Sequence, residues 1–252
     1  MKDILSPRHR HVLEALARAP ALLAFDYDGV LAPLVTEPAG ARMRPGTRRL
    51  LRRVAALYPC AVVSGRSWRD TTRFVSGLVP TVVGNHGFEL GEEVPVPPDV
   101  LERVLVWKRE LEAALAGVPG VHFEYKRSTL AVHYGLSRAW RRAGREVRAA
   151  AERLHGARLV QGKKVLNVLP GHFPTKGDAV RALLARGGLE TALYAGDDVT
   201  DEDVFGIGAP AVLGIHVGEG RSLAVYRLRS QAEIDALLLI LIELRRWPPV
   251  LP

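Results

Sequence analysis

Cysteine is almost absent from this chain of 252 residues, which contains only Cys60. One cysteine excludes a disulfide framework and a cysteine-rich zinc site, and it fits a protein of the reducing cytoplasm. The longest hydrophobic run near the C-terminus, Leu237–Ile242, falls far short of the roughly 20 apolar residues that cross a membrane. Charged side chains interrupt residues 1–20, so no signal peptide is expected there. We therefore expect a cytoplasmic protein without a membrane partner.

Neither sign of charge is scarce: the chain has 35 basic and 27 acidic residues, which gives a formal net charge of +8. With 48% hydrophobic and 25% charged residues, the composition excludes a disordered tail protein, a collagen-like chain and a coiled coil. The basic excess favours an anionic partner, but it does not choose among nucleic acid, a membrane and a phosphorylated metabolite. The chain lacks a zinc finger, an aromatic-interleaved RNA motif and a basic-region heptad, so we expect no nucleic-acid partner.

Short, mainly apolar segments alternate with amphipathic ones in the first third of the chain. Ala21–Phe25, Cys60–Val63 and Thr81–Val83 end in acidic or glycine-containing turns, a pattern typical of buried parallel strands. Arg44–Tyr58 has apolar residues at helical spacing among arginines. The alternation predicts an α/β fold with a doubly wound, Rossmann-like parallel sheet. In such a fold, ligands bind beyond the carboxyl ends of the strands.

A different pattern interrupts this alternation. The proline-rich stretch Glu92–Asp99 has the composition of a linker. After it we expect a helix, two strands, a second helix and two more strands, before the first pattern resumes at Pro174. The sequence therefore predicts a discontinuous core of residues 1–93 and 171–252, with an inserted α+β domain of residues 94–170.

Two carboxylates follow the first expected strand. Asp26 and Asp28 precede Gly29, and side chains at positions i and i+2 of an extended chain share a face. Carboxylates this close raise each other's proton affinity unless a cation compensates. An Asx-type turn after a strand is the alternative interpretation of such a motif taken alone.

Other polar groups follow in an order that favours a catalytic site over a turn. Ser64 and Gly65 can offer a hydroxyl and a backbone N–H to an oxyanion at a helix start. Lys176 precedes another expected helix. Residues 197–203 contain five carboxylates, and Thr200 among them is interpreted as a helix N-cap. So many carboxylates at a strand end indicate a site for a hard cation, most simply Mg²⁺.

Together these groups meet the requirements of phosphoryl transfer to a carboxylate. Asp26 can attack phosphorus in line, and Mg²⁺ would reduce the repulsion between that carboxylate and a phosphate dianion. Ser64, Gly65 and Lys176 can hold the charge on the equatorial oxygens. Asp28 can act as general acid and then as general base. The sequence thus predicts a Mg²⁺-dependent phosphomonoesterase that forms an aspartyl-phosphate.

These motifs, in this order, resemble the haloacid-dehalogenase-like (HAD) phosphatase superfamily. The chain from about Leu22 to Leu241 further resembles its trehalose-6-phosphate phosphatase branch. The stretches that carry this second resemblance are Gly84–Glu89, Phe123–Lys126, Val132–Tyr134, Gln161–Pro170, Gly196–Glu202 and Val217–Gly220. The resemblance implies a HAD core with an inserted, mobile cap domain that determines substrate specificity, and the hydrolysis of trehalose 6-phosphate in trehalose biosynthesis.

The resemblance also implies roles for individual residues. Asp26 is expected to be the nucleophile and a magnesium ligand, and Asp28 the acid and base that gives its backbone carbonyl to the metal. Asp197 is expected to be the third protein ligand, with Asp198 and Asp201 in support. The residues expected to contact substrate are Arg66, Asn85, His86, Glu124, Lys126 and Asn167. His133 is expected to be a structural residue of a cap strand.

Two positions depart from the family pattern. Asn167 stands where the family has a glutamate, and Gly135 where it usually has an arginine. A phosphatase for another glycosyl phosphate, such as sucrose 6-phosphate, is therefore the alternative function. A non-catalytic sugar-phosphate-binding module is the alternative from another class. We also expect the cap to close over Asp26, and the protein to be a monomer.

Overall fold

The computed structural model describes residues 1–35 and 40–246. The chain forms two compact units. The core unit consists of Met1–Glu93 and Pro174–Pro252, and the inserted unit of Val94–Phe173. No helix of the described residues is long and apolar enough to cross a membrane.

An eight-stranded sheet forms the centre of the core unit within the described residues. Its strands lie in the order β1 (Lys2–Asp3), β12 (Tyr226–Leu228), β11 (Val212–Val217), β10 (Thr191–Gly196), β2 (Ala21–Phe25), β3 (Cys60–Val63), β4 (Thr81–Gly84) and β5 (Glu89–Leu90). Neighbouring strands are parallel except for β4 and β5. The chain winds from β2 outward through β3 to β4 and returns at β10, on the other side of β2. The carboxyl end of β2 is therefore the point where the winding direction changes, which is where open α/β sheets bind ligands.

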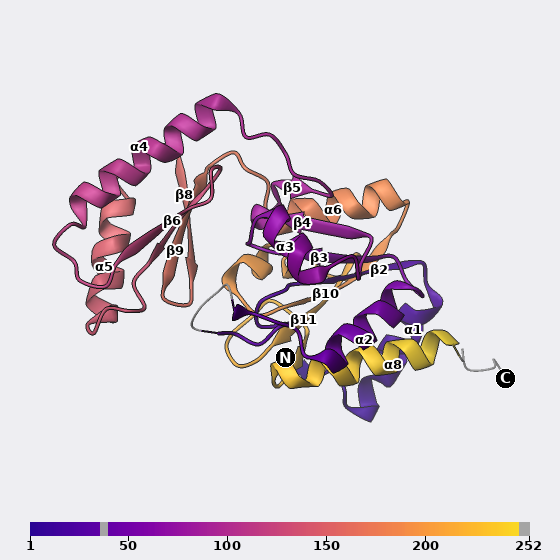
Figure 1. The fold of residues 1–252 in the computed structure, drawn as a ribbon. Coiled ribbons are helices and arrows are strands. Elements are labelled where there is room, and N and C mark those ends of the chain that lie inside the picture. The colour runs from indigo at the N-terminus through magenta and orange to yellow at the C-terminus, as the bar shows by residue number, and fades with distance from the viewer. Residues whose placement is uncertain (36–39, 247–252) are drawn as a thin grey trace. The chain divides into compact units, whose positions relative to one another are not determined.

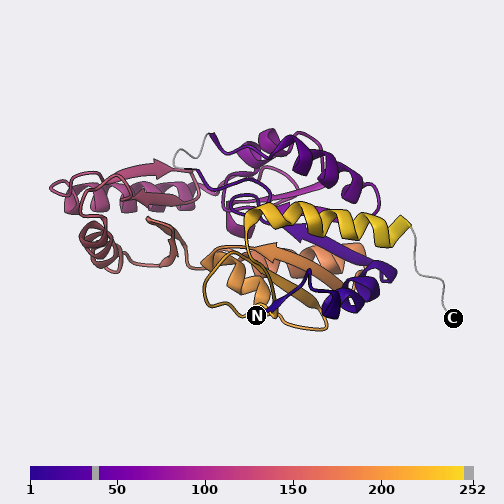
Figure 2. The ribbon, with the colours of Figure 1, turned by 90° about the horizontal axis from the view of Figure 1, so that it is seen from below.

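Helices cover both faces of this sheet, so its central strands β2 and β3 are wholly apolar and buried. Leu23 and Phe25 of β2 belong to one hydrophobic cluster, and Leu22 and Ala24 to another. The first cluster is covered by α1 (Arg10–Arg18), α2 (Pro45–Ala55), α3 (Trp68–Val75) and α8 (Ile234–Arg246). The second is covered by α6 (Lys176–Gly187) and α7 (Glu202–Phe205). Figures 1 and 2 show α8 running between α1 and α2.

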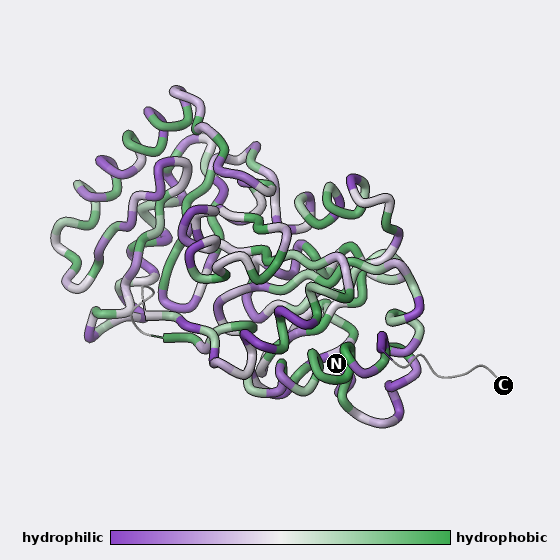
Figure 3. The backbone as a smooth tube through the Cα atoms, turned by 45° about the vertical axis from the view of Figure 1, so that its right-hand side comes forward, coloured by the Kyte–Doolittle hydropathy of each residue, from purple (hydrophilic) through white to green (hydrophobic). Residues whose placement is uncertain are grey.

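The inserted unit is an α+β structure. Its antiparallel sheet has the order β6 (His122–Tyr125), β7 (Leu130–His133), β9 (Val165–Pro170) and β8 (Ala157–Gly162). Its helices are α4 (Pro98–Ala114) and α5 (Trp140–Ala151). Hydrophobic and hydrophilic stretches alternate along α4 in Figure 3, because one helix face, with Val104, Trp107 and Leu111, is buried. The helix, strand, strand, helix, strand, strand order is the one predicted from the sequence.

Register in this small sheet places several polar residues together. Glu124 lies opposite Ala131, and Ala131 lies opposite Asn167. His122, two residues before Glu124, lies opposite His133. Directly opposed residues and residues two apart share a face. The same sheet face therefore carries Glu124, His133, His122 and Asn167, while the intervening Leu130, Val132, Leu166 and Val168 are buried.

Several elements differ from the sequence prediction. The first strand β1 and helix α1 were not predicted, since β1 has two residues and α1 begins among charged side chains. Helix α6 begins at Lys176 rather than after it, because Thr175 is the N-cap and forms a capping box with Asp178. Short 3-10 helices occur at Pro7–His9, Asn85–Gly87, Val199–Asp201 and Gln231–Glu233.

Candidate active site

Asp26 lies at the carboxyl end of β2, and its side chain is buried. Its backbone N–H donates to the carbonyl of Ala195 on β10 at 2.9 Å, which continues the parallel pairing one residue past the strand. One carboxylate oxygen accepts from the N–H of Tyr27 at 2.6 Å. The other accepts from the ammonium of Lys176 at 2.9 Å. The position of this carboxylate is thus fixed from two sides.

Lys176 is buried, with 2% of its surface exposed. Its Nζ donates to Asp26 at 2.9 Å and to Asp201 at 2.7 Å. Burial alone would lower the pKa of this ammonium, but the carboxylates of Asp201 and Asp26 raise it above its ordinary value. Lys176 therefore carries a positive charge at the place where sequence analysis predicted one.

The acidic segment after β10 is folded around the carboxylate of Asp201, which is fully buried. One of its oxygens accepts from the backbone N–H groups of Asp197 and Asp198, at 2.8 and 2.9 Å. The N-cap of the short helix Val199–Asp201 is Asp198, in a capping box with Asp201. The prediction of Thr200 as the N-cap was wrong, because the helical turn starts two residues earlier than the sequence suggested.

Three carboxylates converge at this edge of the sheet. Oxygen atoms of Asp26, Asp197 and Asp201 all lie within 4.8 Å of one another. Asp197 packs directly over Gly29, where a Cβ atom would overlap its carboxylate and where φ is +75°. Burial raises the pKa of Asp26 well above its ordinary value, Lys176 opposes this effect, and Asp201 and Asp197 raise it further. A site with such an excess of buried negative charge, built from oxygen donors, fits a divalent cation.

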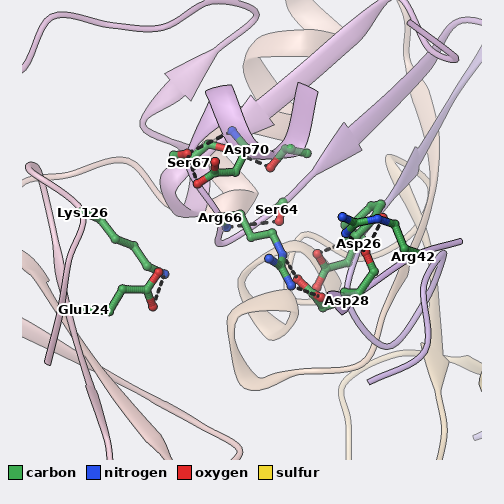
Figure 4. Close-up of polar contacts among 12 residues, drawn as sticks. Asp26, Asp28, Arg42, Ser64, Arg66, Ser67, Asp70, Glu124 and Lys126 are labelled. Atoms are coloured by element: carbon green, nitrogen blue, oxygen red, sulfur yellow. Dashed lines mark hydrogen bonds and ion pairs between the residues drawn. The ribbon is translucent and has the colours of Figure 1, made fainter. Parts of the chain in front are cut away.

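Asp28 and Asp198 are outside this group of three. Asp28 instead forms a two-pronged ion pair with Arg66, whose Nε and Nη2 donate to its two oxygens at 2.6 and 2.7 Å (Figure 4). The Arg66 guanidinium also lies over the ring of Phe74, 4.9 Å from its centroid. Arg66 was predicted to contact substrate, and the structure places it on the predicted acid and base. This geometry fixes the Asp28 carboxylate in one orientation.

Ser64 directly follows β3, which is paired with β2, and its side chain is fully buried. Its Oγ accepts from the N–H of Arg66 at 3.1 Å. The turn at Asn85 and His86 folds back on this segment: the N–H of His86 donates to the Ser64 carbonyl, and that of Asn85 to the Arg66 carbonyl. Asn85 and His86 both have left-handed φ angles, 46° and 58°. Non-glycine residues rarely adopt this conformation, and residues that do so tend to cluster at functional sites.

Glycines allow this turn to pack closely. A Cβ atom on Gly65 would overlap the His86 ring, and one on Gly87 would overlap the carbonyl of Thr175, just before Lys176. The turn therefore connects the Ser64 segment to the start of α6, which carries the lysine. Five predicted residues, Ser64, Gly65, Arg66, Asn85 and His86, are in this way brought together in one packed assembly.

Two residues of this region were missed by sequence analysis. Glu89 is buried and accepts from the N–H of Trp68, at the first turn of α3, at 2.6 Å. Burial raises the pKa of its carboxyl. Tyr194 is buried in β10 and donates its hydroxyl to Asp201 at 2.7 Å. A glutamate just after the Asn85–Gly87 turn and a tyrosine inside an apolar strand were the available signals.

The inserted unit holds the remaining predicted residues. Glu124 is half exposed, and its carboxylate lies 3.7 Å from the Lys126 ammonium (Figure 4). The same oxygen lies 3.0 Å from Nε2 of His133. Asn167 shares their sheet face but is 9% exposed. His133, which was predicted to be a structural residue of a cap strand, thus contacts Glu124.

Comparison with known proteins identifies the family. A model described as trehalose-phosphatase matches residues 24–222. This chain belongs to the trehalose-phosphatase family. It is 34% identical over 241 residues to a trehalose-phosphate phosphatase of Mycobacterium tuberculosis, covering 87% of this chain and 60% of that protein. It is 30% identical over 256 residues to a probable trehalose-phosphate phosphatase 4 of Oryza sativa subsp. japonica, covering 93% and 69%. This chain therefore spans about three fifths of the mycobacterial relative's length.

Solved structures show the same fold. The C-terminal domain of a C. albicans trehalose-6-phosphate phosphatase superimposes with a TM-score of 0.79 at 20% identity, covering 93% of this chain and 96% of that one. These neighbours share the HAD-phosphatase fold, so the predicted doubly wound α/β core with an inserted α+β unit is confirmed.

Proposed function

We propose that this protein hydrolyses trehalose 6-phosphate to trehalose and inorganic phosphate, with Mg²⁺ as its cofactor. Family membership supports the reaction class and the substrate. The observation that carries the chemistry is the convergence of the Asp26, Asp197 and Asp201 carboxylates around one point, next to the charged Lys176. A non-catalytic sugar-phosphate-binding module would not need a fixed nucleophile beside such a site.

In the proposed mechanism, an oxygen of Asp26 forms a bond to phosphorus as the bond between phosphorus and the sugar oxygen breaks. Lys176, the Ser64 hydroxyl and the Gly65 N–H hold the negative charge on the equatorial oxygens. Asp28 gives a proton to the departing sugar oxygen and then takes one from the water that releases phosphate. Arg66 orients the Asp28 carboxylate for both transfers.

When bound, Mg²⁺ offsets the repulsion between the Asp26 carboxylate and a phosphate dianion. Asp26, Asp197 and the backbone carbonyl of Asp28 would hold it, with Asp198 and Asp201 in support. We therefore expect EDTA to abolish phosphate release and added Mg²⁺ to restore it. Activity that persists after metal removal and dialysis would contradict this part of the proposal.

The inserted unit is proposed to act as the cap and to recognise the sugar. Its polar sheet face presents Glu124, Lys126 and Asn167, groups that can hydrogen-bond sugar hydroxyls. His86 and Asn85 are proposed as further substrate contacts from the core unit. We also propose that the protein works as a monomer in the cytoplasm. Sedimentation velocity would show a single species of one chain's mass if the monomer assignment is right.

A phosphatase for a different disaccharide phosphate is the second candidate. It is favoured by Asn167, because this uncharged side chain cannot form the charge-assisted bonds of a carboxylate. Sucrose-phosphatase from Synechocystis superimposes with a TM-score of 0.56 at 15% identity, which shows a shared fold alone. The decisive test is phosphate release from trehalose 6-phosphate, sucrose 6-phosphate and glucose 6-phosphate at equal concentrations. Trehalose 6-phosphate should give the highest kcat/KM, and a rate no higher than for glucose 6-phosphate would refute the proposal.

A further inference from the structure

A buried tyrosine lies beneath the acidic loop and has no role in the mechanism above. Tyr194 is fully buried on the face of β10 that packs against α6 and α7. Its ring makes an edge contact with Phe205, with centroids 5.8 Å apart. This packing fixes the ring, so the position of the hydroxyl is fixed too. The hydroxyl donates to an oxygen of Asp201 at 2.7 Å.

Asp201 receives four hydrogen bonds. One oxygen accepts from Tyr194 and Lys176, both at 2.7 Å. The other accepts from the backbone N–H groups of Asp197 and Asp198. A carboxylate has about four acceptor positions, so these donors occupy Asp201 fully. Asp201 therefore stabilises the loop through these four bonds, and Asp197 is the other residue of this loop whose carboxylate belongs to the group with Asp26.

We propose that Tyr194 is a positioning residue for the metal site, which acts by holding Asp201 in the orientation that fixes the Asp197 loop and the Lys176 ammonium. The inference rests on the proposed metal-dependent function and extends it to a residue that touches neither the metal nor the substrate.

The consequence of losing the hydroxyl follows from the bonds that remain. Without Tyr194 as donor, one oxygen of the buried Asp201 carboxylate is held by Lys176 alone. The carboxylate can then turn toward that lysine, and its bonds to the Asp197 and Asp198 amides weaken. Asp197 packs directly over Gly29 and lies close to Asp26. A small shift of the Asp197 backbone therefore moves its oxygens relative to Asp26. Residues that orient metal ligands in this way typically contribute about 10- to 100-fold to metal affinity.

The test is the binding of Mg²⁺ alone, measured by titration calorimetry without substrate. Tyr194→Phe keeps the ring and removes only the hydroxyl, and its Kd for Mg²⁺ should rise by about 10- to 100-fold. Tyr58→Phe is the matched control, since Tyr58 is also buried and donates its hydroxyl to the Leu241 carbonyl at 2.8 Å, away from the acidic loop. It removes one buried hydrogen bond and should leave the Kd unchanged.

A double-mutant cycle tests whether Tyr194 acts through Asp201. Asp201→Asn should weaken Mg²⁺ binding by itself, and adding Tyr194→Phe should then change the Kd by less than about twofold. If Tyr194→Phe unfolds, the Asp201→Asn titration still decides, because unchanged Mg²⁺ affinity in that variant would overturn the proposal. Wild-type affinity in a folded Tyr194→Phe, or an equal loss in Tyr58→Phe, would also overturn it. Mg²⁺ binding without trehalose 6-phosphate hydrolysis would instead refute the proposed function alone.

Discussion

Two sets of charged groups in this molecule are built in opposite ways. In the core unit, Asp26, Lys176 and Asp201 are buried and each makes several short hydrogen bonds. On the sheet of the inserted unit, the Glu124 side chain is 49% exposed and its partners are His133 and Lys126. Buried charges interact strongly because water does not screen them, and exposed charges interact weakly. The comparison supports the proposal that the core unit carries out the chemistry and that the inserted unit recognises a solvated ligand.

The largest expected effect tests the buried side of this comparison. Lys176→Met removes the cation between two buried carboxylates, which should lower the free energy of unfolding by about 3–5 kcal/mol. The same change should lower kcat by about 10²- to 10³-fold, because a charge-stabilising group of the transition state is lost. Urea unfolding and steady-state phosphate release would measure both. Wild-type stability in this variant would show that the buried ion pairs are not coupled as described.

A smaller effect is expected at Arg66, which is only partly buried. Arg66→Met removes both bonds to Asp28, so the carboxylate is free to rotate, and kcat should fall by about 10²-fold with little change in KM. Arg48→Met is a matched control, because Arg48 donates to the Phe74 carbonyl, beside the same ring. A change in KM with constant kcat would instead make Arg66 a substrate-binding residue, as the sequence first suggested.

At the exposed face of the inserted unit the effect should appear in binding. Glu124→Gln should raise KM by about tenfold and leave kcat close to wild type, since it weakens a hydrogen bond to a charged group. Glu146→Gln serves as the control, because Glu146 accepts from Arg142 on α5 of the same unit. If Glu124→Gln lowered kcat and preserved KM, the division between chemistry and recognition would be wrong.

The smallest effect concerns the pH dependence of stability at Glu89. Because burial raises the pKa of its carboxyl above 4.5 in the folded protein, the folded state binds this proton more tightly than the unfolded state. The contribution of the protonated Glu89 carboxyl to the free energy of unfolding is thus present at low pH. It is lost as pH rises from about 4.5 through the folded-state pKa. Relative to Glu89→Gln, wild-type stability should therefore decrease over this range in metal-free urea titrations. A difference in the free energy of unfolding between wild type and Glu89→Gln that does not change with pH would contradict the raised pKa of Glu89.

Sequence was a good guide where chemistry and periodicity coincide. The apolar runs of β2, β3 and β10 and the polar residues that follow them were enough to predict the sheet and to place Asp26, Ser64 and Asp197 at one edge. These predictions succeed because parallel strands end at a common edge whatever the details of packing.

Side-chain partners could not be predicted in the same way. Nothing in the spacing of Asp28 and Arg66 indicates that they form an ion pair, because it depends on the rotamer that Phe74 supports. The role of Asp198 as N-cap depends on where one helical turn begins. Tyr194 was hidden because a tyrosine in a buried strand has the same pattern as any large apolar residue.

The most direct test of the account is to find the phosphoryl group during turnover. Enzyme mixed with trehalose 6-phosphate and Mg²⁺ is quenched in acid and its peptides are analysed by mass spectrometry. The account predicts one added phosphoryl group on the peptide that contains Asp26, absent from a folded and inactive Asp26→Asn variant. A phosphoryl group on another residue, or steady turnover by Asp26→Asn, would contradict it.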